Sequence, residues 1–183
     1  MLYNNFVLTG DTDDNISTGP GQDFVISNGG NDTVMSGTGS DMVIAGSGDD
    51  KVFGEGAQDF LFGGIGNDEL NGGSGNDWLF GGEGNDLITG GIGSDKIIGG
   101  AGADIFNYES TIDSNGRSFD IIFSFEQGND LIDLSALDSE GISSFSDITV
   151  SNQGATTSIS GNNVDFFIQL QGGYNLTDAD FIF

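Results

Sequence analysis

An aspartate recurs at every ninth position over more than half of the chain, and carboxylates at a fixed spacing can bind metal ions. Each is the sixth residue of a nonapeptide with the pattern Gly-Gly-x-Gly-x-Asp-x-apolar-x, which is most regular in residues 63–107. In the same frame, eleven consecutive repeats fill residues 9–107. Such a period predicts a solenoid of stacked repeats. The sixth positions are Asp14, Asp23, Asp32, Asp41, Asp50, Asp59, Asp68, Asp77, Asp86, Asp95 and Asp104.

Each nonapeptide combines a glycine-rich turn with a short extended segment. The x-apolar-x tripeptide has the alternation of a strand that points one side chain inward. Two repeats complete one coil, and successive coils stack at the strand spacing of about 4.8 Å. We therefore expect an all-β parallel solenoid whose core is formed by the eighth positions. These are Ile16, Val25, Val34, Val43, Val52, Leu61, Leu70, Leu79, Ile88, Ile97 and Phe106.

The turns predict the identity of the metal. Glycines at the first, second and fourth positions are expected to adopt positive φ and to leave carbonyl oxygens unshielded. Stacking brings aspartates two repeats apart to about 5 Å, where bare carboxylates repel by roughly 1 to 3 kcal/mol. Calcium reverses this effect because it accepts six or more carboxylate and carbonyl oxygens in a loose geometry. The predicted ligands are the repeat aspartates and the carbonyls of Gly37, Gly39, Gly46, Gly48, Gly64, Gly66, Gly73, Gly75, Gly82, Gly84, Gly91, Gly93, Gly100 and Gly102.

Eleven repeats contain nine pairs that lie two repeats apart, so up to nine calcium ions fit between the coils. The sites are not expected to be equal, because Thr12, Asn28, Glu55 and Ala57 replace glycines at the second or fourth position and a side chain at positive φ is strained. The strongest sites should begin at Gly63. With so thin an interior, the chain should be unfolded at low calcium and ordered at millimolar calcium.

Bulk composition excludes several classes of function. The net charge of −26 argues against nucleic acid as a partner, since phosphate binding needs clustered Lys and Arg. The absence of Cys excludes a disulfide framework and thiolate metal sites. Residues 1–20 have no Sec-type leader pattern, and no apolar run reaches the length of a membrane span.

No combination of residues points to catalysis. Without His there is no Ser-His-Asp triad and no His-Glu-x-x-His zinc site. The glycine-rich turns also lack the Lys-Ser/Thr of a phosphate-binding loop. We therefore expect a non-catalytic module.

The two faces of the predicted solenoid differ in polarity. Positions seven and nine of the even-numbered repeats form an apolar stripe, which should be covered by the carboxyl-terminal segment, a neighbouring domain or a second copy of the chain. Its aromatic rings could also stack on a polysaccharide. The stripe contains Phe24, Ile26, Met42, Ile44, Phe60, Phe62, Trp78, Phe80 and Ile98, with Lys96 as its one polar member.

The nonapeptide resembles the calcium-binding repeat of the RTX (repeats-in-toxin) family. This resemblance covers residues 9–107 and is specific, because eleven copies lie in phase. It implies a right-handed parallel β-roll in which calcium is held by the sixth-position aspartates and the turn carbonyls. The R-modules of alginate epimerases are a similar case, and they imply calcium-dependent polysaccharide binding.

The carboxyl-terminal segment is similar to the end of serralysin-type proteases and related type I secreted proteins. The similar residues are Gly102-Ala-Asp-Ile-Phe, Phe119-Asp-Ile-Ile-Phe-Ser-Phe, Gly128-Asn-Asp-Leu-Ile-Asp-Leu-Ser and Leu176-Thr-Asp-Ala-Asp-Phe-Ile-Phe. This resemblance implies an uncleaved carboxyl-terminal signal read by an ABC exporter, and hence an extracellular protein. It also implies a further calcium site beside Asp104, with Asp113, Asp120 and Asp130 as candidate ligands.

Three segments are therefore expected: residues 1–8 as a degenerate first strand, 9–107 as the repeats, and 108–183 as a cap of β-strands that closes the solenoid. Three functions remain open. The leading one is a calcium-triggered secretion and folding module of a larger secreted enzyme. The others are a calcium-dependent polysaccharide-binding module and a free-standing secreted structural or adhesive protein.

Overall fold

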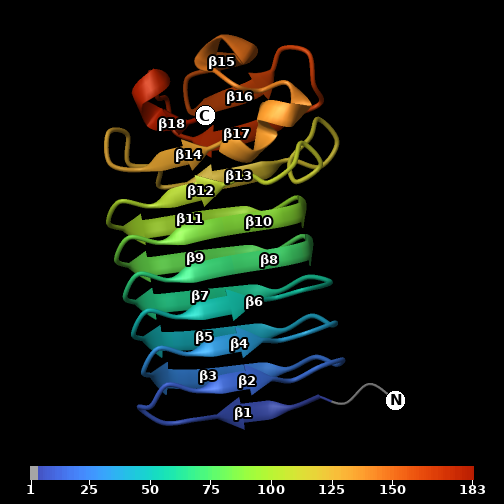
Figure 1. Ribbon diagram of the computed structural model, residues 1–183, viewed down its shortest axis with the longest axis vertical. Coiled ribbons are helices and arrows are strands. Elements are labelled where there is room, and N and C mark those ends of the chain that lie inside the picture. Colours follow the sequence, from blue (N-terminus) through green and yellow to red (C-terminus); the bar gives the residue numbers. More distant parts are fainter. Residues whose placement is uncertain (1–3) are drawn as a thin grey trace.

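The computed structural model describes residues 4–183, which form a β-solenoid with two sheets on opposite sides of one thin core (Figure 1). Residues 1–3 of the expected N-terminal segment lie outside the described residues. The chain alternates between the sheets, so that each pair of successive repeats adds one strand to each sheet. The expected all-β parallel solenoid is confirmed.

The first sheet has ten strands and carries the even-numbered repeats. In spatial order its strands are β1 (Phe6–Leu8), β3 (Phe24–Gly29), β5 (Met42–Ser47), β7 (Phe60–Ile65), β9 (Trp78–Glu83), β11 (Lys96–Ala101), β13 (Asp120–Phe123), β17 (Phe167–Gln171), β16 (Thr156–Gly161) and β15 (Ile148–Asn152).

The second sheet has eight strands and carries the odd-numbered repeats. In spatial order its strands are β2 (Asn15–Ser17), β4 (Thr33–Met35), β6 (Lys51–Phe53), β8 (Glu69–Gly75), β10 (Leu87–Gly93), β12 (Ile105–Asn107), β14 (Leu131–Asp133) and β18 (Phe181–Ile182).

The register of the sheets fixes the stacking of the repeats. Neighbouring strands within the repeats pair in parallel between residues eighteen apart, as in Phe24↔Met42 and Val34↔Val52. Every residue therefore lies beside its equivalent two repeats later. All eleven eighth-position side chains are buried, so one apolar residue per nonapeptide forms the core of the roll.

Three local details differ from the sequence prediction. Several strands are longer than three residues, because they continue into the first positions of the next repeat, as β7 and β8 do. The first-position glycines from Gly54 onward are absent from the residues with positive φ, unlike most second- and fourth-position glycines. Thr12 also has no positive φ, whereas Asn28, Glu55 and Ala57 have φ of 72°, 67° and 76°. The expected strain therefore applies to these three residues only.

The parallel stacking continues beyond the last nonapeptide. Strands β13 and β14 pair with β11 and β12, and β17 and β18 extend the sheets by one further strand each. The antiparallel strands β16 and β15 then complete the ten-stranded sheet. Short 3-10 helices η1 (Ser135–Glu140), η2 (Phe145–Asp147) and η3 (Asp178–Asp180) connect these strands.

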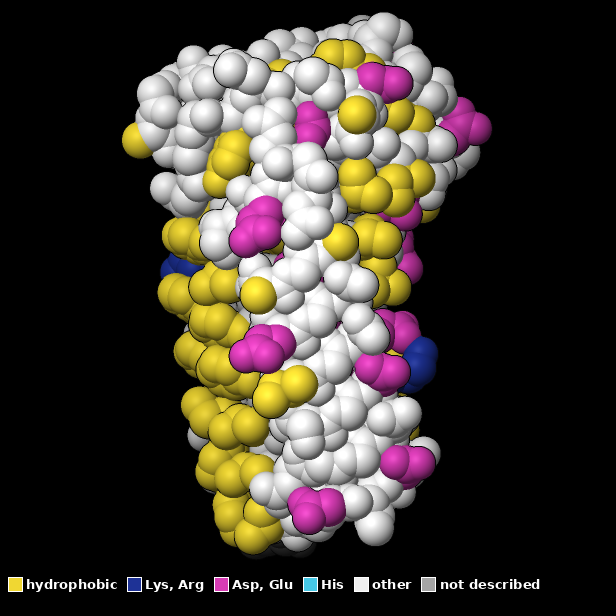
Figure 2. Space-filling model, turned by 90° about the vertical axis from the view of Figure 1, so that its left-hand side faces the viewer, with side chains coloured by type: hydrophobic (Ala, Val, Ile, Leu, Met, Phe, Trp, Pro, Cys, Tyr) yellow, Lys and Arg dark blue, Asp and Glu magenta, His cyan; other side chains and the backbone are white. Residues whose placement is uncertain are grey.

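This carboxyl-terminal region closes the far end of the roll, as expected for a cap (Figure 1). It does not fold back along the apolar stripe, which runs down one side of the molecule below it (Figure 2). Phe6 and Leu8, at the opposite end, are 64% and 60% exposed. No helix in the described residues is long and apolar enough to cross a membrane.

Candidate metal centres

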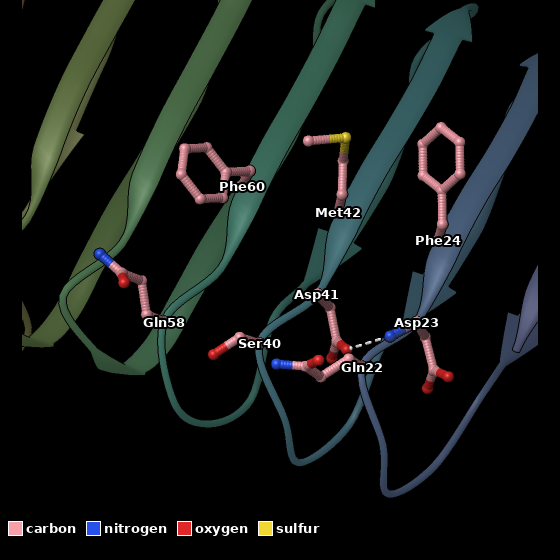
Figure 3. A pocket seen from close by; sticks show the side chains of 8 residues that line it. All are labelled: Gln22, Asp23, Phe24, Ser40, Asp41, Met42, Gln58 and Phe60. Carbon is pink, nitrogen blue, oxygen red and sulfur yellow. Dashed lines mark hydrogen bonds between the residues drawn. The ribbon is translucent and has the colours of Figure 1, made fainter. Parts of the chain in front are cut away.

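The repeat aspartates form two continuous ladders, one along each edge of the roll. In every case the backbone N–H of one aspartate donates a hydrogen bond to Oδ1 of the aspartate in the next coil, at 2.7–3.0 Å within the repeats. Figure 3 shows one such step, from Asp23 to Asp41. The eighteen-residue register causes this pattern, because it places each carboxylate directly over the peptide of its equivalent.

The second carboxylate oxygen in these ladders has no partner. Oδ2 of all eleven repeat aspartates is buried and accepts no hydrogen bond, and the same is true of Asp120. The sixth-position aspartates from Asp23 to Asp104 are at most 3% exposed. Because a buried carboxylate oxygen without a partner is costly, such a row requires protons or cations to neutralise it.

The first-position glycines bring a second oxygen to the same place. A β-carbon built on Gly54, Gly63, Gly72 or Gly81 would lie less than 3.0 Å from Oδ2 of the aspartate in its own repeat. It would also lie less than 3.0 Å from the carbonyl oxygen of the first-position glycine in the next coil. Two oxygens therefore converge beside each bare Cα, close enough to share one cation. Only glycine leaves this space open.

The other turn carbonyls point into the gaps between coils. A β-carbon built on Gly64 or Gly66 would lie less than 3.0 Å from the carbonyl oxygen of Gly46 or Gly48 in the preceding coil. The same arrangement places eight predicted carbonyls toward the next coil, those of Gly46, Gly48, Gly64, Gly66, Gly73, Gly75, Gly82 and Gly84.

The remaining predicted carbonyls are less uniform. The carbonyl of Gly37 accepts a hydrogen bond from Gly56 N–H at 3.2 Å. The carbonyl of Gly102 accepts one from the Asn129 side-chain amide. The Cα atoms of Gly39, Gly91, Gly93 and Gly100 lie against carbonyls of the preceding coil. All six glycines belong to the same turns, but the carbonyls of Gly37 and Gly102 already accept a hydrogen bond.

The donor set fits calcium. No group of three or more His, Cys, Asp or Glu side chains gathers around one point within residues 4–183, so each ion would take most of its ligands from backbone carbonyls. Calcium accepts such mixed oxygen ligands in flexible geometry, whereas zinc prefers Cys and His. The unpartnered Oδ2 atoms and the glycine-lined spaces are the observations that support this fit.

Burial changes the acidity of the ladder aspartates. Removal from water raises the pKa of Asp59 to about 8 and the pKa of Asp68 to about 7, and neighbouring ladder carboxylates add to both shifts. Burial also raises the pKa of Asp95 to about 7, and that of Asp77 and Asp104 to about 6. Without a cation, the centre of each ladder therefore favours the protonated form near neutral pH.

The structure separates the three carboxyl-terminal candidates. Asp120 and Asp130 extend the two ladders, because their Oδ1 atoms accept the N–H groups of Asp95 at 2.9 Å and Asp104 at 3.1 Å. Asp113 lies outside both ladders, and its Oδ2 accepts the N–H groups of Glu109 and Ser110 within its own loop. The structure therefore places Asp130 beside Asp104 and Asp120 beside Asp95.

A further ladder was not predicted from the sequence. On the odd-numbered edge, the side-chain oxygen of each fifth-position residue accepts the backbone N–H of its equivalent in the next coil. These bonds run in the opposite direction to those of the sixth-position aspartates. The signal was present in the sequence as Asn or Asp at the fifth position of five successive odd-numbered repeats: Asp13, Asn31, Asp49, Asn67 and Asn85.

On the even-numbered edge the same bond forms at Asn4 and Asn76, but the ladder is interrupted between them. Gln22, Ser40 and Gln58 replace the short acceptors, and their exposed side chains border an open hollow of about 270 Å³ between the aspartate ladder and the apolar stripe (Figure 3). The hollow is also lined by Asp23, Phe24, Asp41, Met42 and Phe60.

The aromatic rings of the apolar stripe stack on one another along the solenoid. Phe62 and Phe80 have ring centroids 4.6 Å apart and planes 6° apart, and Phe60 lies 6.2 Å from Trp78 at 9°. Lys96 Nζ lies 4.2 Å from the centroid of the Trp78 ring. Each of these rings therefore has at least one face against a neighbouring ring or this ammonium group.

Comparison with known families matches the nonapeptides over most of their length. Segments 8–43, 35–70 and 71–106 each match the RTX calcium-binding nonapeptide repeat (4 copies), and together they cover more than half of the chain. No curated protein sequence matches the chain.

The chain is also similar to parts of solved structures. The AlgE6R2 subunit of the Azotobacter vinelandii mannuronan C5-epimerase is similar over 73% of this chain and 91% of its own length, with 28% identity and a TM-score of 0.58. The AlgE6R3 subunit of that epimerase matches 94% of this chain and 79% of its own length, at 23% identity and a TM-score of 0.42. Extracellular lipase LipA from Serratia marcescens matches all of this chain and 40% of its own length, at 14% identity and a TM-score of 0.38.

Proposed function

The chain belongs to the RTX calcium-binding nonapeptide repeat family, and from this premise we propose that it is a calcium-triggered folding module of a larger secreted protein. RTX repeats are typical of secreted bacterial proteins. Residues 4–183 form the β-roll and its carboxyl-terminal region, with no catalytic domain evident in them. In this proposal, catalysis belongs to another part of the parent protein, such as a protease, lipase or polysaccharide-modifying enzyme.

The row of buried, unpartnered Oδ2 atoms supports the calcium trigger most directly. In the unfolded chain these carboxylates are hydrated and far apart, whereas folding stacks them without water. A site whose free calcium stands tenfold above its dissociation constant adds about 1.4 kcal/mol to folding. Up to nine such sites would contribute an amount comparable to the whole stability of a typical domain.

We assign the calcium ligands to the sixth-position aspartates of residues 9–107 together with the glycine carbonyls of the turns. Asp120 joins this set as the last member of its ladder, because its Oδ1 continues the hydrogen-bond pattern and its Oδ2 has no partner. Asp130 continues the other ladder through Oδ1, but its Oδ2 already accepts the Glu126 N–H at 2.8 Å. Asp113 is the weakest candidate, since its Oδ2 is already used by two backbone donors. In this proposal β1 begins the roll, and residues 108–183 form its cap.

The proposed route out of the cell is a type I (ABC) exporter that reads the carboxyl-terminal end. Cytosolic calcium is too low to fill sites of millimolar affinity, so the acidic chain would remain unfolded and could be threaded. Extracellular calcium would then order it. The last residues, Asp180 to Phe183, end in an apolar strand: Asp180 closes a capping box with Thr177, and Phe181 pairs with Ile132.

Far-ultraviolet circular dichroism tests the calcium trigger. The chain in EGTA should give a disordered spectrum, and millimolar calcium should convert it to a β spectrum, whereas equal magnesium should not. A compact, protease-resistant chain in chelator, unchanged by calcium, would contradict the proposal.

A calcium-dependent polysaccharide-binding module is the second candidate. The similarity to a subunit of a mannuronan C5-epimerase over 91% of its length supports it. The net charge of −26 opposes an acidic polymer unless calcium bridges the two. The stripe is a poor sugar platform, because its ring faces are stacked on one another. A glycan array probed with and without calcium separates this candidate from the first.

We further propose that the apolar stripe docks a neighbouring domain of the parent protein or a second copy of the chain. Its positions carry no acidic residue although the chain is strongly acidic, and Figure 2 shows them as a continuous column. Replacing Trp78 and Phe80 with Ser should change the association state at unaltered calcium stoichiometry. A free-standing adhesive protein would show the same calcium response without such an association.

A further inference from the structure

The first position of the repeat changes type along the roll. The first four repeats carry a hydroxyl there, in Thr9, Thr18, Ser27 and Ser36, and the fifth carries Ala45. From Gly54 onward every first position is glycine. This position borders the space where the aspartate Oδ2 and a carbonyl of the next coil converge in the later repeats.

In the early repeats each hydroxyl bridges to the next coil. Thr9 and Thr18 donate to the carbonyl oxygens of Ser27 at 3.0 Å and Ser36 at 2.7 Å. Ser27 and Ser36 donate to the carbonyl oxygens of Ala45 at 3.1 Å and Gly54 at 3.2 Å. Two hydroxyl ladders therefore run beside the two aspartate ladders over the first third of the chain.

The acceptors of these hydroxyl hydrogen bonds are the carbonyl oxygens of first-position residues. In the later repeats, the first-position carbonyls lie beside Oδ2 of an aspartate. Those of Gly72, Gly81, Gly90 and Gly99 face a bare Cα and a carboxylate oxygen. In the early repeats a neutral O–H group fills this space. A carbonyl that already accepts a hydrogen bond is a weaker ligand for a cation, and the bond itself joins the coils.

We propose that these four hydroxyls add calcium-independent links between the first six repeats, so that the N-terminal part of the roll becomes ordered at lower calcium concentrations than the part from Gly54 onward. The unpartnered Oδ2 atoms of these repeats still require calcium. The inference rests on the proposed calcium trigger and divides the roll into two parts. The hydroxyl-linked part provides a preformed end on which the calcium-dependent coils stack, since repeats are stabilised by their neighbours.

Hydrogen exchange during a calcium titration tests this division. Amides of β2 to β6 should become protected at a calcium concentration on the order of fivefold lower than amides of β8 to β12. The Ser27→Gly, Ser36→Gly double variant should lose this difference, because two of the hydroxyl links are removed, and calorimetry should count at least as many calcium ions at saturation as for the wild-type chain.

Ser40→Gly is the matched control, because Ser40 lies in the same repeat as Ser36 but is exposed at the fifth position. It should keep the wild-type titration and stoichiometry. The inference is overturned if both segments gain protection at the same calcium concentration, or if the double variant binds fewer ions, which would make the hydroxyls ligands. A chain that does not respond to calcium at all would instead contradict the proposed function.

Discussion

The roll and the carboxyl-terminal region satisfy their buried polar atoms in different ways. Every coil of the roll leaves a buried aspartate oxygen without a partner, up to Asp104 and Asp120. In the carboxyl-terminal region, residues 108–183, this state is confined to the Tyr108 hydroxyl and Asp120 Oδ2, which adjoin the last coil. The roll therefore depends on something outside the chain far more than the region that closes it.

The carboxyl-terminal region supplies its own donors. Asp180 accepts from the backbone and hydroxyl of Thr177, and Asp147 accepts from Ser143 and Ser144. Its core is also thicker, with Leu134, Leu137, Ile142, Phe166 and Ile168 all buried. One apolar residue per nonapeptide cannot provide as much buried area, so the roll must gain stability from its edges.

Acidity should affect the two regions in opposite directions, and this is the largest expected effect. Burial raises the pKa of Asp59 to about 8 and of Asp68 and Asp95 to about 7, so the metal-free folded roll holds protons that the unfolded chain releases. Its stability is therefore greatest below about pH 4 and is lost as the pH rises toward 8. Circular dichroism of the calcium-free chain should show order at pH 4 and disorder at pH 8.

For two acidic residues outside the roll, the dependence of stability on pH has the opposite sign. Hydrogen bonds from Thr111 lower the pKa of Glu140, and those from Ser143 and Ser144 lower the pKa of Asp147. These bonds stabilise the fold at neutral pH and are lost when the carboxyls are protonated in acid. Protection factors of amides near η1 and η2, corrected for the slower intrinsic exchange in acid, should therefore fall at low pH in saturating calcium. A metal-free roll that gains order as the pH rises would contradict the comparison.

A methyl group added at a first-position glycine, where an aspartate Oδ2 and a carbonyl oxygen converge, should produce the next largest effect. Gly81→Ala places a β-carbon less than 3.0 Å from Asp86 Oδ2 and the Gly99 carbonyl. We expect the loss of at least one bound calcium and a destabilisation of about 1 to 3 kcal/mol from overpacking. Calcium stoichiometry and chemical unfolding in saturating calcium measure both effects.

Gly10→Ala is the matched control in the roll, because a β-carbon there meets nothing within 4 Å and φ is not positive. It should keep full stoichiometry and nearly full stability. If Gly81→Ala retained every calcium ion while Gly10→Ala lost one, the glycine-lined spaces would not be the sites.

Most of the roll could be predicted because its period is explicit in the sequence. The eleven aspartates, the eighth-position core and the apolar stripe follow from one alignment of the chain with itself. The need for glycine at the first position was attributed to backbone conformation, but it arises from the close approach of an aspartate and a carbonyl of the next coil. Such a contact depends on the eighteen-residue register and on side-chain direction, which the pattern does not contain.

The end of the roll was harder to predict. Asp120 and Asp130 continue the ladders after insertions that change the spacing to 25 and 26 residues. No fixed period could therefore place them. Asp113 looked equivalent to them in the sequence, but it caps its own loop. The fifth-position ladder was visible as a run of Asn and Asp, but the direction of its hydrogen bonds could only come from the three-dimensional stacking.

The smallest expected effect lies in the carboxyl-terminal region and should be independent of calcium. The buried Thr157 hydroxyl donates to the Gly172 carbonyl at 3.0 Å and accepts the Tyr174 N–H at 2.8 Å. Thr157→Val conserves the shape but leaves both backbone groups without their partner, which should cost about 1 to 3 kcal/mol. Thr156→Val, on the neighbouring and less buried position, should cost much less. Because neither side chain faces the ladders, both variants should bind the wild-type number of calcium ions; a loss of ions from Thr157→Val would show that the two regions are not separately stabilised.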